Sequence, residues 1–317
     1  MKGTVTKLYG KGCIVATDPS AREQYECYLR GRLFEKSGVQ FAVGDRVEFD
    51  PVEKFHHAGS SGDKNRLTGV IHEILPRRSA LTRPAKRKEQ NPQLIAANVD
   101  QLIIVSALKK PQYKTGLIDR YLIVAHRAGI ETALCLNKID IGQSTELEKA
   151  RTELQPYRDL GFPVVWSSAK TGEGCDDLRA LLEDKRSVLV GHSGVGKSKL
   201  AGRMQPGVTL ASSAVRRSGK GRHTTSVSTL IPLEFGGELV DTPGVRELGV
   251  VDMSREELAR YFIEFEPFLG SCKFKSCSHI PEPGCAIKEA VESGEIHRVR
   301  HESYENLYHE LSSVGRR

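Results

Sequence analysis

An octapeptide rich in glycine carries the clearest chemistry in the sequence. It fits the pattern G-x-x-x-x-G-K-[ST] and follows an apolar run at residues 187–190. Glycines at this spacing let backbone N–H groups curl around a β-phosphate, a following helix points its positive end at that phosphate, and the lysine bridges the β and γ oxygens. The serine is expected to hold magnesium. The residues predicted to contact phosphates or magnesium are Gly191, His192, Ser193, Gly194, Val195, Gly196, Lys197, Ser198 and Lys199.

A second motif chooses between ATP and GTP, which the octapeptide alone does not. Asn137-Lys138-Ile139-Asp140 follows an apolar strand predicted at 132–136. The Asp140 carboxylate can accept hydrogen bonds from N1–H and the 2-amino group of guanine, whereas adenine has neither donor and would leave the carboxylate unpaired. We expect Asn137 to tie this base loop to the phosphate loop, and the stem of Lys138 to cover the base.

Two further segments complete the predicted pocket. Ser168-Ala169-Lys170 follows a strand predicted at 164–166, so its backbone N–H groups can meet guanine O6 while Lys170 flanks the ring. Asp241-Thr242-Pro243-Gly244 follows a strand predicted at 238–240. We expect Asp241 to hold magnesium through water and the Gly244 N–H to meet the γ-phosphate. Each of these two segments taken alone would indicate only a turn after a strand. Their assignment to the pocket depends on the phosphate-loop octapeptide and on Asn137-Lys138-Ile139-Asp140.

These loops require buried strands to position them. Apolar strands predicted at 101–107, 132–136, 164–166 and 187–190 alternate with helices at 117–128 and 145–154. This alternation indicates a parallel sheet covered by helices on both faces, which binds ligands at the carboxyl ends of its strands. Strands at 229–235 and 238–240 flank Gly236-Gly237, a hairpin turn signal.

The N-terminal region differs in both pattern and charge. Five short strands, predicted at 3–8, 13–17, 24–29, 46–49 and 68–74, favour a small barrel of the OB type. Residues 1–90 hold 17 Lys and Arg against 11 Asp and Glu, out of a net charge of +7 for the chain. Six of these basic residues lie between Arg77 and Lys88, with no acid among them. This excess of positive charge favours RNA as a partner. Two alternatives remain open: the basic segment is only a solvated linker, and the barrel only supports the neighbouring domain.

Three thiols and one imidazole cluster late in the chain. Cys272, Cys277, His279 and Cys285 fall within fourteen residues and form the ligand set of a tetrahedral structural zinc. Disulfides and a redox centre are the alternatives. A shell of four protein ligands leaves no open position for catalysis, so the metal would staple a small domain. We interpret His297, His301 and His309 as surface or RNA-facing residues.

The motifs together closely resemble the RsgA (YjeQ) family, over essentially the whole chain. In Ras-like GTPases the base motifs come last, whereas here they precede the phosphate loop, with a barrel before and a cysteine cluster after. The family consists of circularly permuted GTPases that assist late maturation of the small ribosomal subunit. The resemblance implies a multidomain chain: an OB-fold RNA-binding domain at 1–80, a basic linker at 81–95, a circularly permuted α/β P-loop GTPase domain at 96–260, and a mainly helical zinc-binding domain at 261–317. It also implies binding to the small subunit and its rRNA, and hydrolysis of GTP to GDP and phosphate as a checkpoint that releases the protein.

The catalytic residues are predicted to be Lys197, Thr225 and His223. Thr225, or its neighbour Thr224, would complete the magnesium shell from a glycine-rich switch segment at 214–226. Many GTPases place a Gln or His just after D-x-x-G to orient the attacking water, but here that residue is Val245. Intrinsic hydrolysis should therefore be slow, with strong stimulation by the small subunit implied by the resemblance. His223 is the candidate replacement; an exposed loop histidine or one that touches RNA is the alternative.

The lengths of the apolar stretches and the N-terminal residues bear on where the protein is located in the cell. Its apolar stretches are far shorter than the roughly 20 residues that cross a bilayer, and the N-terminus lacks the pattern of a secretory signal. We expect a cytoplasmic protein, without a membrane partner and monomeric. Two alternative functions stay open: an RNA-binding scaffold that holds nucleotide only for structure, and an assembly GTPase for another RNA particle such as the large subunit.

Overall fold

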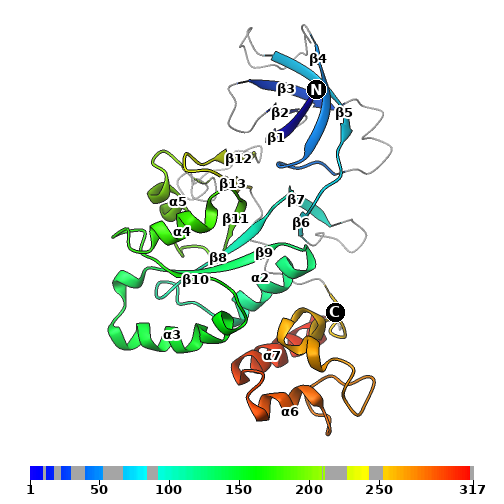
Figure 1. Ribbon diagram of the computed structural model, residues 1–317, viewed down its shortest axis with the longest axis vertical. Coiled ribbons are helices and arrows are strands. Elements are labelled where there is room, and N and C mark those ends of the chain that lie inside the picture. Colours follow the sequence, from blue (N-terminus) through cyan, green and yellow to red (C-terminus); the bar gives the residue numbers. More distant parts are fainter. Residues whose placement is uncertain are drawn as a thin grey trace.

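The computed structural model describes residues 1–9, 12–17, 23–29, 40–52, 67–83, 92–208, 210, 227–242 and 253–314. Figure 1 shows three stacked parts: a β-barrel at the N-terminal end, a central layered α/β domain, and a helical C-terminal domain at the opposite end. In the described part of the chain, no helix is long and apolar enough to pass through a bilayer.

The five strands predicted at the N-terminus are all present. They pair in the order β1-β2-β3-β5-β4, and a β1–β4 pairing closes the barrel. Val47 and Phe49 are buried and alternate with more accessible neighbours along β4; they point into a core that includes Val15, Cys27 and Ile71. The strands are β1 (Lys2–Tyr9), β2 (Gly12–Ala16), β3 (Gln24–Leu29), β4 (Arg46–Val52) and β5 (Leu67–Ile74).

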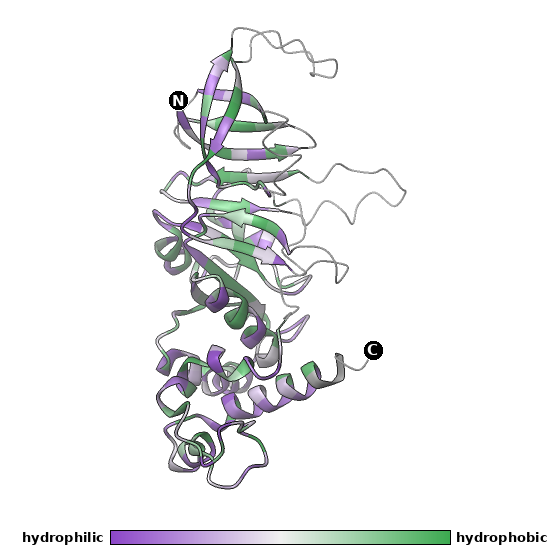
Figure 2. Cartoon of the chain, turned by 90° about the vertical axis from the view of Figure 1, so that its right-hand side faces the viewer, coloured by the Kyte–Doolittle hydropathy of each residue, from purple (hydrophilic) through white to green (hydrophobic). Residues whose placement is uncertain are grey.

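The central sheet continues in the order β10-β9-β8-β11-β13-β12. Its strands are parallel except β12, which pairs antiparallel with β13 across the predicted Gly236-Gly237 turn, where φ is 97° and 81°. Figure 2 shows hydrophobic residues concentrated along these strands. The strands are β8 (Gln101–Ala107), β9 (Glu131–Asn137), β10 (Val164–Trp166), β11 (Arg186–Val190), β12 (Ser228–Pro232) and β13 (Glu238–Asp241).

Helices cover both faces of this sheet, as predicted. Leu102 and Ile104 of β8 pack with helices α2 and α3, whereas Ile103 and Val105 pack with α4 and α5 on the other face. Alternate residues of a strand point to opposite faces, so β8, which is buried along its whole length, needs cover on both sides. The helices are α2 (Thr115–Arg127), α3 (Ser144–Asp159), α4 (Cys175–Leu182) and α5 (Lys197–Met204), and a short 3-10 helix, η1 (Ile139–Ile141), follows β9.

The segment interpreted as a basic linker is more ordered than predicted at both ends. Strands β6 (Ala80–Arg83) and β7 (Gln93–Ala97) pair antiparallel as a separate two-stranded sheet. Leu81 and Ala96, opposite each other, are fully buried. The segment 81–95, predicted as a basic linker, thus begins within β6 and ends within β7, two strands that the sequence analysis did not predict.

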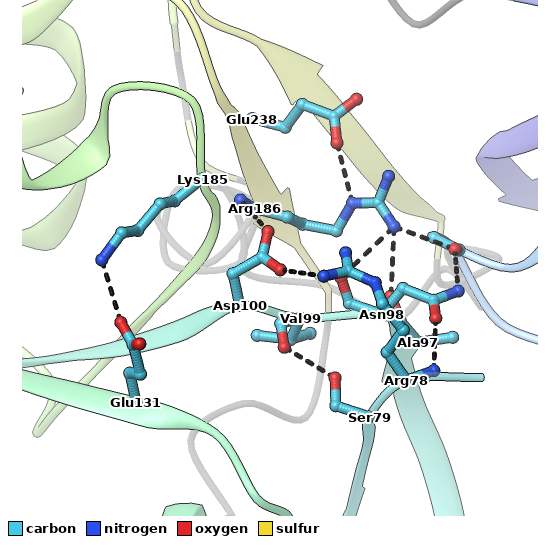
Figure 3. Close-up of polar contacts among 11 residues, drawn as sticks. Arg78, Ser79, Ala97, Asn98, Val99, Asp100, Glu131, Lys185, Arg186 and Glu238 are labelled. Atoms are coloured by element: carbon cyan, nitrogen blue, oxygen red, sulfur yellow. Dashed lines mark hydrogen bonds and ion pairs between the residues drawn. The ribbon is translucent and has the colours of Figure 1, made fainter.

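The barrel and the central sheet are joined through the backbone, which the sequence did not predict. Strand β1 pairs with β12, placing Lys7 opposite Thr229, so all eleven strands form one continuous sheet. Arg186 reinforces the junction: its guanidinium donates to the Gly44 carbonyl of the barrel at 2.9 Å and to the Glu238 carboxylate at 2.7 Å (Figure 3). Asn98 also donates to the Gly44 carbonyl, at 2.8 Å.

The C-terminal domain is small and built around aromatic rings. Phe262, Phe265 and Tyr304 stack or meet edge to face with centroids 5.1–5.3 Å apart. Its elements are the 3-10 helices η4 (Leu258–Tyr261) and η5 (Ile263–Phe268) and the α-helices α6 (Ala286–Ser293) and α7 (Arg298–Val314).

Arg300 of α7 fastens this domain to the central domain. Its side chain is 3% exposed and pairs with Asp119 on α2 and with Glu264 on η5. Asp119 is fully buried and also accepts from the hydroxyls of Tyr157 and Ser303. Helix α7 is thus held by side chains that are almost inaccessible to water.

Candidate nucleotide and metal sites

Four predicted loops meet at one edge of the central sheet. The phosphate loop follows β11, the base loop follows β9, the Ser168 turn follows β10, and Asp241 ends β13. These strands are parallel, so their carboxyl ends share an edge, and ligands bind there in open α/β sheets.

The phosphate loop has the backbone that its glycines allow. Gly191, Gly194 and Gly196 adopt φ of 137°, 89° and 107°. A side chain on Gly191 would place its Cβ 2.0 Å from the Val105 carbonyl oxygen, and one on Gly196 would lie 2.3 Å from Asn137 Nδ2. The loop can therefore pack this closely only with glycine at both positions, and α5 begins at Lys197 as predicted.

Lys197 lies within the loop. It is 8% exposed, and its Nζ donates to the carbonyls of Gly191 at 2.6 Å and His192 at 3.2 Å. Val195 is buried and anchors the loop in the core under α5, whereas His192 is exposed. The other polar members, Ser193 and Ser198, are partly exposed, and Lys199 is exposed.

Asn137 connects three of the loops. The side chain is 1% exposed; its Nδ2 donates to the Val195 carbonyl at 2.8 Å, and its Oδ1 accepts from the Ala169 N–H at 3.1 Å. The link between base loop and phosphate loop that the sequence predicted is present. The same amide also fixes the Ser168 turn, which the sequence did not indicate.

Asp140 stands exposed beside this connection. Its Oδ1 accepts a hydrogen bond from Ser168 Oγ at 2.7 Å, and that hydroxyl accepts from the N–H groups of Lys170 at 3.3 Å and Thr171 at 3.1 Å. The buried Ser168 side chain therefore orients the carboxylate. Sequence reasoning assigned this serine only a backbone role.

Lys138 adopts a left-handed conformation, φ 64°, and its ammonium donates to the carbonyl of Lys110. Partial burial lowers the pKa of Lys138, and the nearby positive charge of Lys199 lowers it further. Lys110 precedes Pro111, whose Cδ lies 3.5 Å from where a Cβ on Gly194 would be. The Lys110-Pro111 segment thus contacts the base loop and lies close to the phosphate loop, and it was missed because it carries no recognisable motif.

Asp241 and Thr242 lie at the end of β13 and are both buried. Among the described residues, the Thr242 hydroxyl has no hydrogen-bond partner. Such a group is one that a bound ligand or water could satisfy. The predicted residues Gly244, His223 and Thr225, with Thr224 and Val245, lie outside the described residues.

The predicted metal ligands converge in the C-terminal domain. One donor atom from each of Cys272, Cys277, His279 and Cys285 lies within 4.8 Å of the other three. His279 Nδ1 is 3.5 Å from the sulfurs of Cys272 and Cys285. Three sulfurs and one imidazole nitrogen at this separation fit a tetrahedral zinc ion.

Supporting contacts surround the metal-ligand cluster. The His279 carbonyl lies 2.9 Å from Nε2 of His301, which is 8% exposed. The interpretation of His301 as a surface residue is thus wrong, because helical position alone did not reveal that this face packs on the cluster. Glu282 accepts from the backbone and hydroxyl of Ser278, and these hydrogen bonds hold the pKa of its carboxyl at about 2 despite an opposing effect of burial.

Comparisons with known proteins agree with the motifs. The family model of the RsgA GTPase matches residues 74–251. A Small ribosomal subunit biogenesis GTPase RsgA of Thermotoga petrophila is 39% identical over 317 residues, covering 100% of this chain and 98% of the relative. Small ribosomal subunit biogenesis GTPase RsgA 1 of Vibrio vulnificus is 41% identical over 247 residues, covering 78% and 69%.

Two solved structures share the fold. YjeQ from Thermotoga maritima has a TM-score of 0.79 at 37% identity, covering 100% of this chain and 99% of its own. YloQ, described as a circularly permuted GTPase, has a TM-score of 0.72 at 27% identity, covering 100% and 96%. The resemblance inferred from the motifs is confirmed, and the chain belongs to the RsgA GTPase family.

Proposed function

We propose that this GTPase binds GTP across the carboxyl edge of its parallel sheet and hydrolyses it during assembly of the small ribosomal subunit. The Asn137 side chain is the observation that carries the proposal. It joins the predicted guanine loop to the predicted phosphate loop at 2.8 Å. A hydrogen bond between the two loops fixes the distance between them, as is needed if one loop binds the base and the other binds the phosphates of the same nucleotide.

Guanine recognition follows from the base loop. Asp140 is held by Ser168, leaving its exposed carboxylate able to accept from N1–H and the 2-amino group. The backbone N–H groups of Ala169 and Lys170 lie on the same turn, where the first donates to Asn137 Oδ1 and the second to Ser168 Oγ. Selectivity against ATP would come mainly from the carboxylate left unpaired beside adenine.

The phosphate loop and its neighbours would hold the triphosphate. The ammonium of Lys197 now binds two carbonyl groups of the phosphate loop itself. Because the loop would surround the phosphates, the ammonium can exchange these carbonyls for β and γ oxygens of the nucleotide. Ser198, in the first turn of α5, and Asp241, at the end of β13, would hold magnesium together with Thr225. When bound, magnesium neutralises charge that develops on the phosphates.

Hydrolysis needs a water-orienting group. Val245 cannot polarise water, and we assign that role to His223 of the switch segment at 214–226. Slow intrinsic turnover, raised when a partner completes the site, follows from this arrangement. Release of the protein after hydrolysis, as a checkpoint on late maturation, is the step we assign to GTP cleavage.

The partner is the small ribosomal subunit and its rRNA. The relatives named above are small ribosomal subunit biogenesis GTPases, and they match this chain over most of its length. The barrel order β1-β2-β3-β5-β4 fits an OB-type fold, which binds oligonucleotides, and the region of residues 1–90 is basic. A cytoplasmic monomer with one zinc stapling its C-terminal domain completes the proposal.

Phosphate release measured with and without purified small subunits tests the function. We expect slow turnover that the small subunit raises at least tenfold and the large subunit does not. Asp140→Asn should weaken GTP binding at least 30-fold in calorimetry without strengthening ATP binding, while the same change at Asp177, an exposed carboxylate on α4, should alter it little. No phosphate release in either condition would leave only a scaffold role, and equal affinity for ATP and GTP would refute the pocket.

A further inference from the structure

The loop between the first two cysteines of the metal-ligand cluster exposes an unusual set of side chains. Lys273, Phe274, Lys275 and Ser276 are all exposed. Phe274 is 45% exposed and is the only aromatic among the large hydrophobic residues that the described part of the chain leaves at the surface. An exposed phenylalanine on an ordered element calls for a partner more than a scattered aliphatic residue does.

The loop holds this ring in a defined place. The Cys277 N–H donates to the Phe274 carbonyl at 3.2 Å, closing a turn, and the Lys273 N–H donates to the Gly284 carbonyl at 2.9 Å. Cys272 and Cys277 fix both ends in the metal-ligand cluster. The ring is therefore presented by a braced turn, which lowers the entropy lost when it binds.

Lysines precede and follow Phe274 in the sequence. Lys273 Nζ lies 5.7 Å from the centroid of the Phe274 ring. Glu282, an acidic residue in the same cysteine-rich segment, is turned inward and accepts from Ser278 and Ile280. The exposed turn thus combines an aromatic face with two cationic groups.

The charge of the surrounding domain makes this turn distinctive. Residues 253–314 contain 11 Asp and Glu against 7 Lys and Arg, and one of the seven, Arg300, is buried between two carboxylates. A polyanion would be repelled by most of such a surface and attracted at the turn. The domain can therefore dock on a nucleic acid only in a restricted orientation.

We propose that the turn Lys273–Phe274–Lys275 is an RNA contact in which Phe274 stacks on an unpaired base while the two lysines contact flanking phosphates. RNA-binding proteins recognise unpaired bases by aromatic stacking with electrostatic contacts to the backbone. The inference rests on the proposed ribosomal function, to which it adds a specific residue and a specific feature of the RNA. The proposal predicts that the C-terminal domain recognises unpaired nucleotides of the RNA and not the shape of an RNA double helix.

Affinity for purified small subunits, measured with a non-hydrolysable GTP analogue, tests the stacking contact. Phe274→Ala should raise Kd at least fivefold, whereas Phe274→Trp, which keeps an aromatic ring, should leave Kd near that of the unmodified chain. Val299→Ala, which shortens an exposed aliphatic side chain on α7, should change Kd less than twofold. Zinc content and intrinsic GTPase activity should be the same in all four proteins. Replacing both lysines by alanine should reduce the slope of log Kd against log salt by about 1 to 2.

A photoreactive benzoyl-phenylalanine at position 274 identifies what the ring touches. We expect adducts with rRNA at an unpaired nucleotide. Adducts with a ribosomal protein, or an unchanged Kd for Phe274→Ala in a chain that binds normally, would overturn this inference alone. Failure of the unmodified chain to bind small subunits would overturn the proposed function as well.

Discussion

The central domain is joined to its two neighbours by different physical means. Toward the barrel, the junction is mainly backbone: β1 pairs with β12, and Arg186 donates to carbonyl oxygens of Gly44, Ala97 and Asn98. Toward the C-terminal domain, the junction depends on the buried carboxylate of Asp119, which receives Arg300, Tyr157 and Ser303. The first junction spreads its interactions over main-chain groups. The second relies on side chains: this buried network, and the more exposed pairs Arg120–Glu310 and His297–Asp159.

The difference predicts how each junction responds to mutation. Main-chain hydrogen bonds survive most substitutions, so the barrel should stay attached when single side chains change. A buried charge that loses its partner is destabilising by about 3–5 kcal/mol. The C-terminal domain should therefore be the part that single substitutions can detach, while the barrel stays attached to the central domain.

Removing the metal should have the largest effect. Chelation, or Cys285→Ala, should unfold residues 253–314 while the barrel and GTPase domain stay folded, because structural zinc contributes about 10–16 kcal/mol to folding of small domains. Metal analysis should find one zinc per chain, and hydrogen exchange should localise the loss of protection. Loss of protection in the barrel as well would show that the two junctions are not independent.

Breaking the ion network should come next. Arg300→Met leaves Asp119 and Glu264 without their cation and should lower the free energy of unfolding of the C-terminal domain by about 3–5 kcal/mol in urea titrations. Arg298→Met, an exposed arginine on the same helix, should cost under about 0.5 kcal/mol. A fully apolar replacement, Arg300→Met with Asp119→Leu and Glu264→Met, should recover much of the loss, and no recovery would argue against the unpaired charge as the cause.

The smallest effect should be at the barrel junction. Arg186→Met removes the donors to Gly44 and Glu238 but leaves the Asn98 bond to Gly44 and the β1–β12 pairing, so we expect a cost of about 1.5–3 kcal/mol. Lys185→Met, which breaks only an exposed pair with Glu131, should change stability by at most about 0.5 kcal/mol. Urea unfolding followed by barrel-specific amide exchange measures both; an Arg186 effect larger than that of Arg300 would reverse the comparison.

Local patterns predicted the elements well. Apolar runs and alternation located every strand of the barrel and of the central sheet, because each is bounded by turns and buried on at least one face. The four loops predicted to bind nucleotide follow the strands expected of them, and they could be predicted because each needs particular residues at fixed spacing. The Cys and His ligands were found for the same reason, and all four converge in the structure.

Contacts between residues far apart in the chain could not be predicted from local sequence patterns. Nothing local shows that Lys7 lies opposite Thr229, or that Asp119 on α2 receives Arg300 from α7. Strands β6 and β7 were missed because charged neighbours hid four- and five-residue strands. Ser168 was assigned to the right turn, but its contact with Asp140 depends on how two loops approach in space.

The pairing of β1 with β12 has a consequence for synthesis of the chain. Lys7 leaves the translating ribosome more than two hundred residues before Thr229, its partner in the sheet. During that interval the newly made barrel presents an unpaired stretch of strand edge, the kind of surface on which foreign strands can add. Nascent chains that stop before residue 228 should therefore depend most on chaperones, and their demand should fall once β12 is translated and covers that edge.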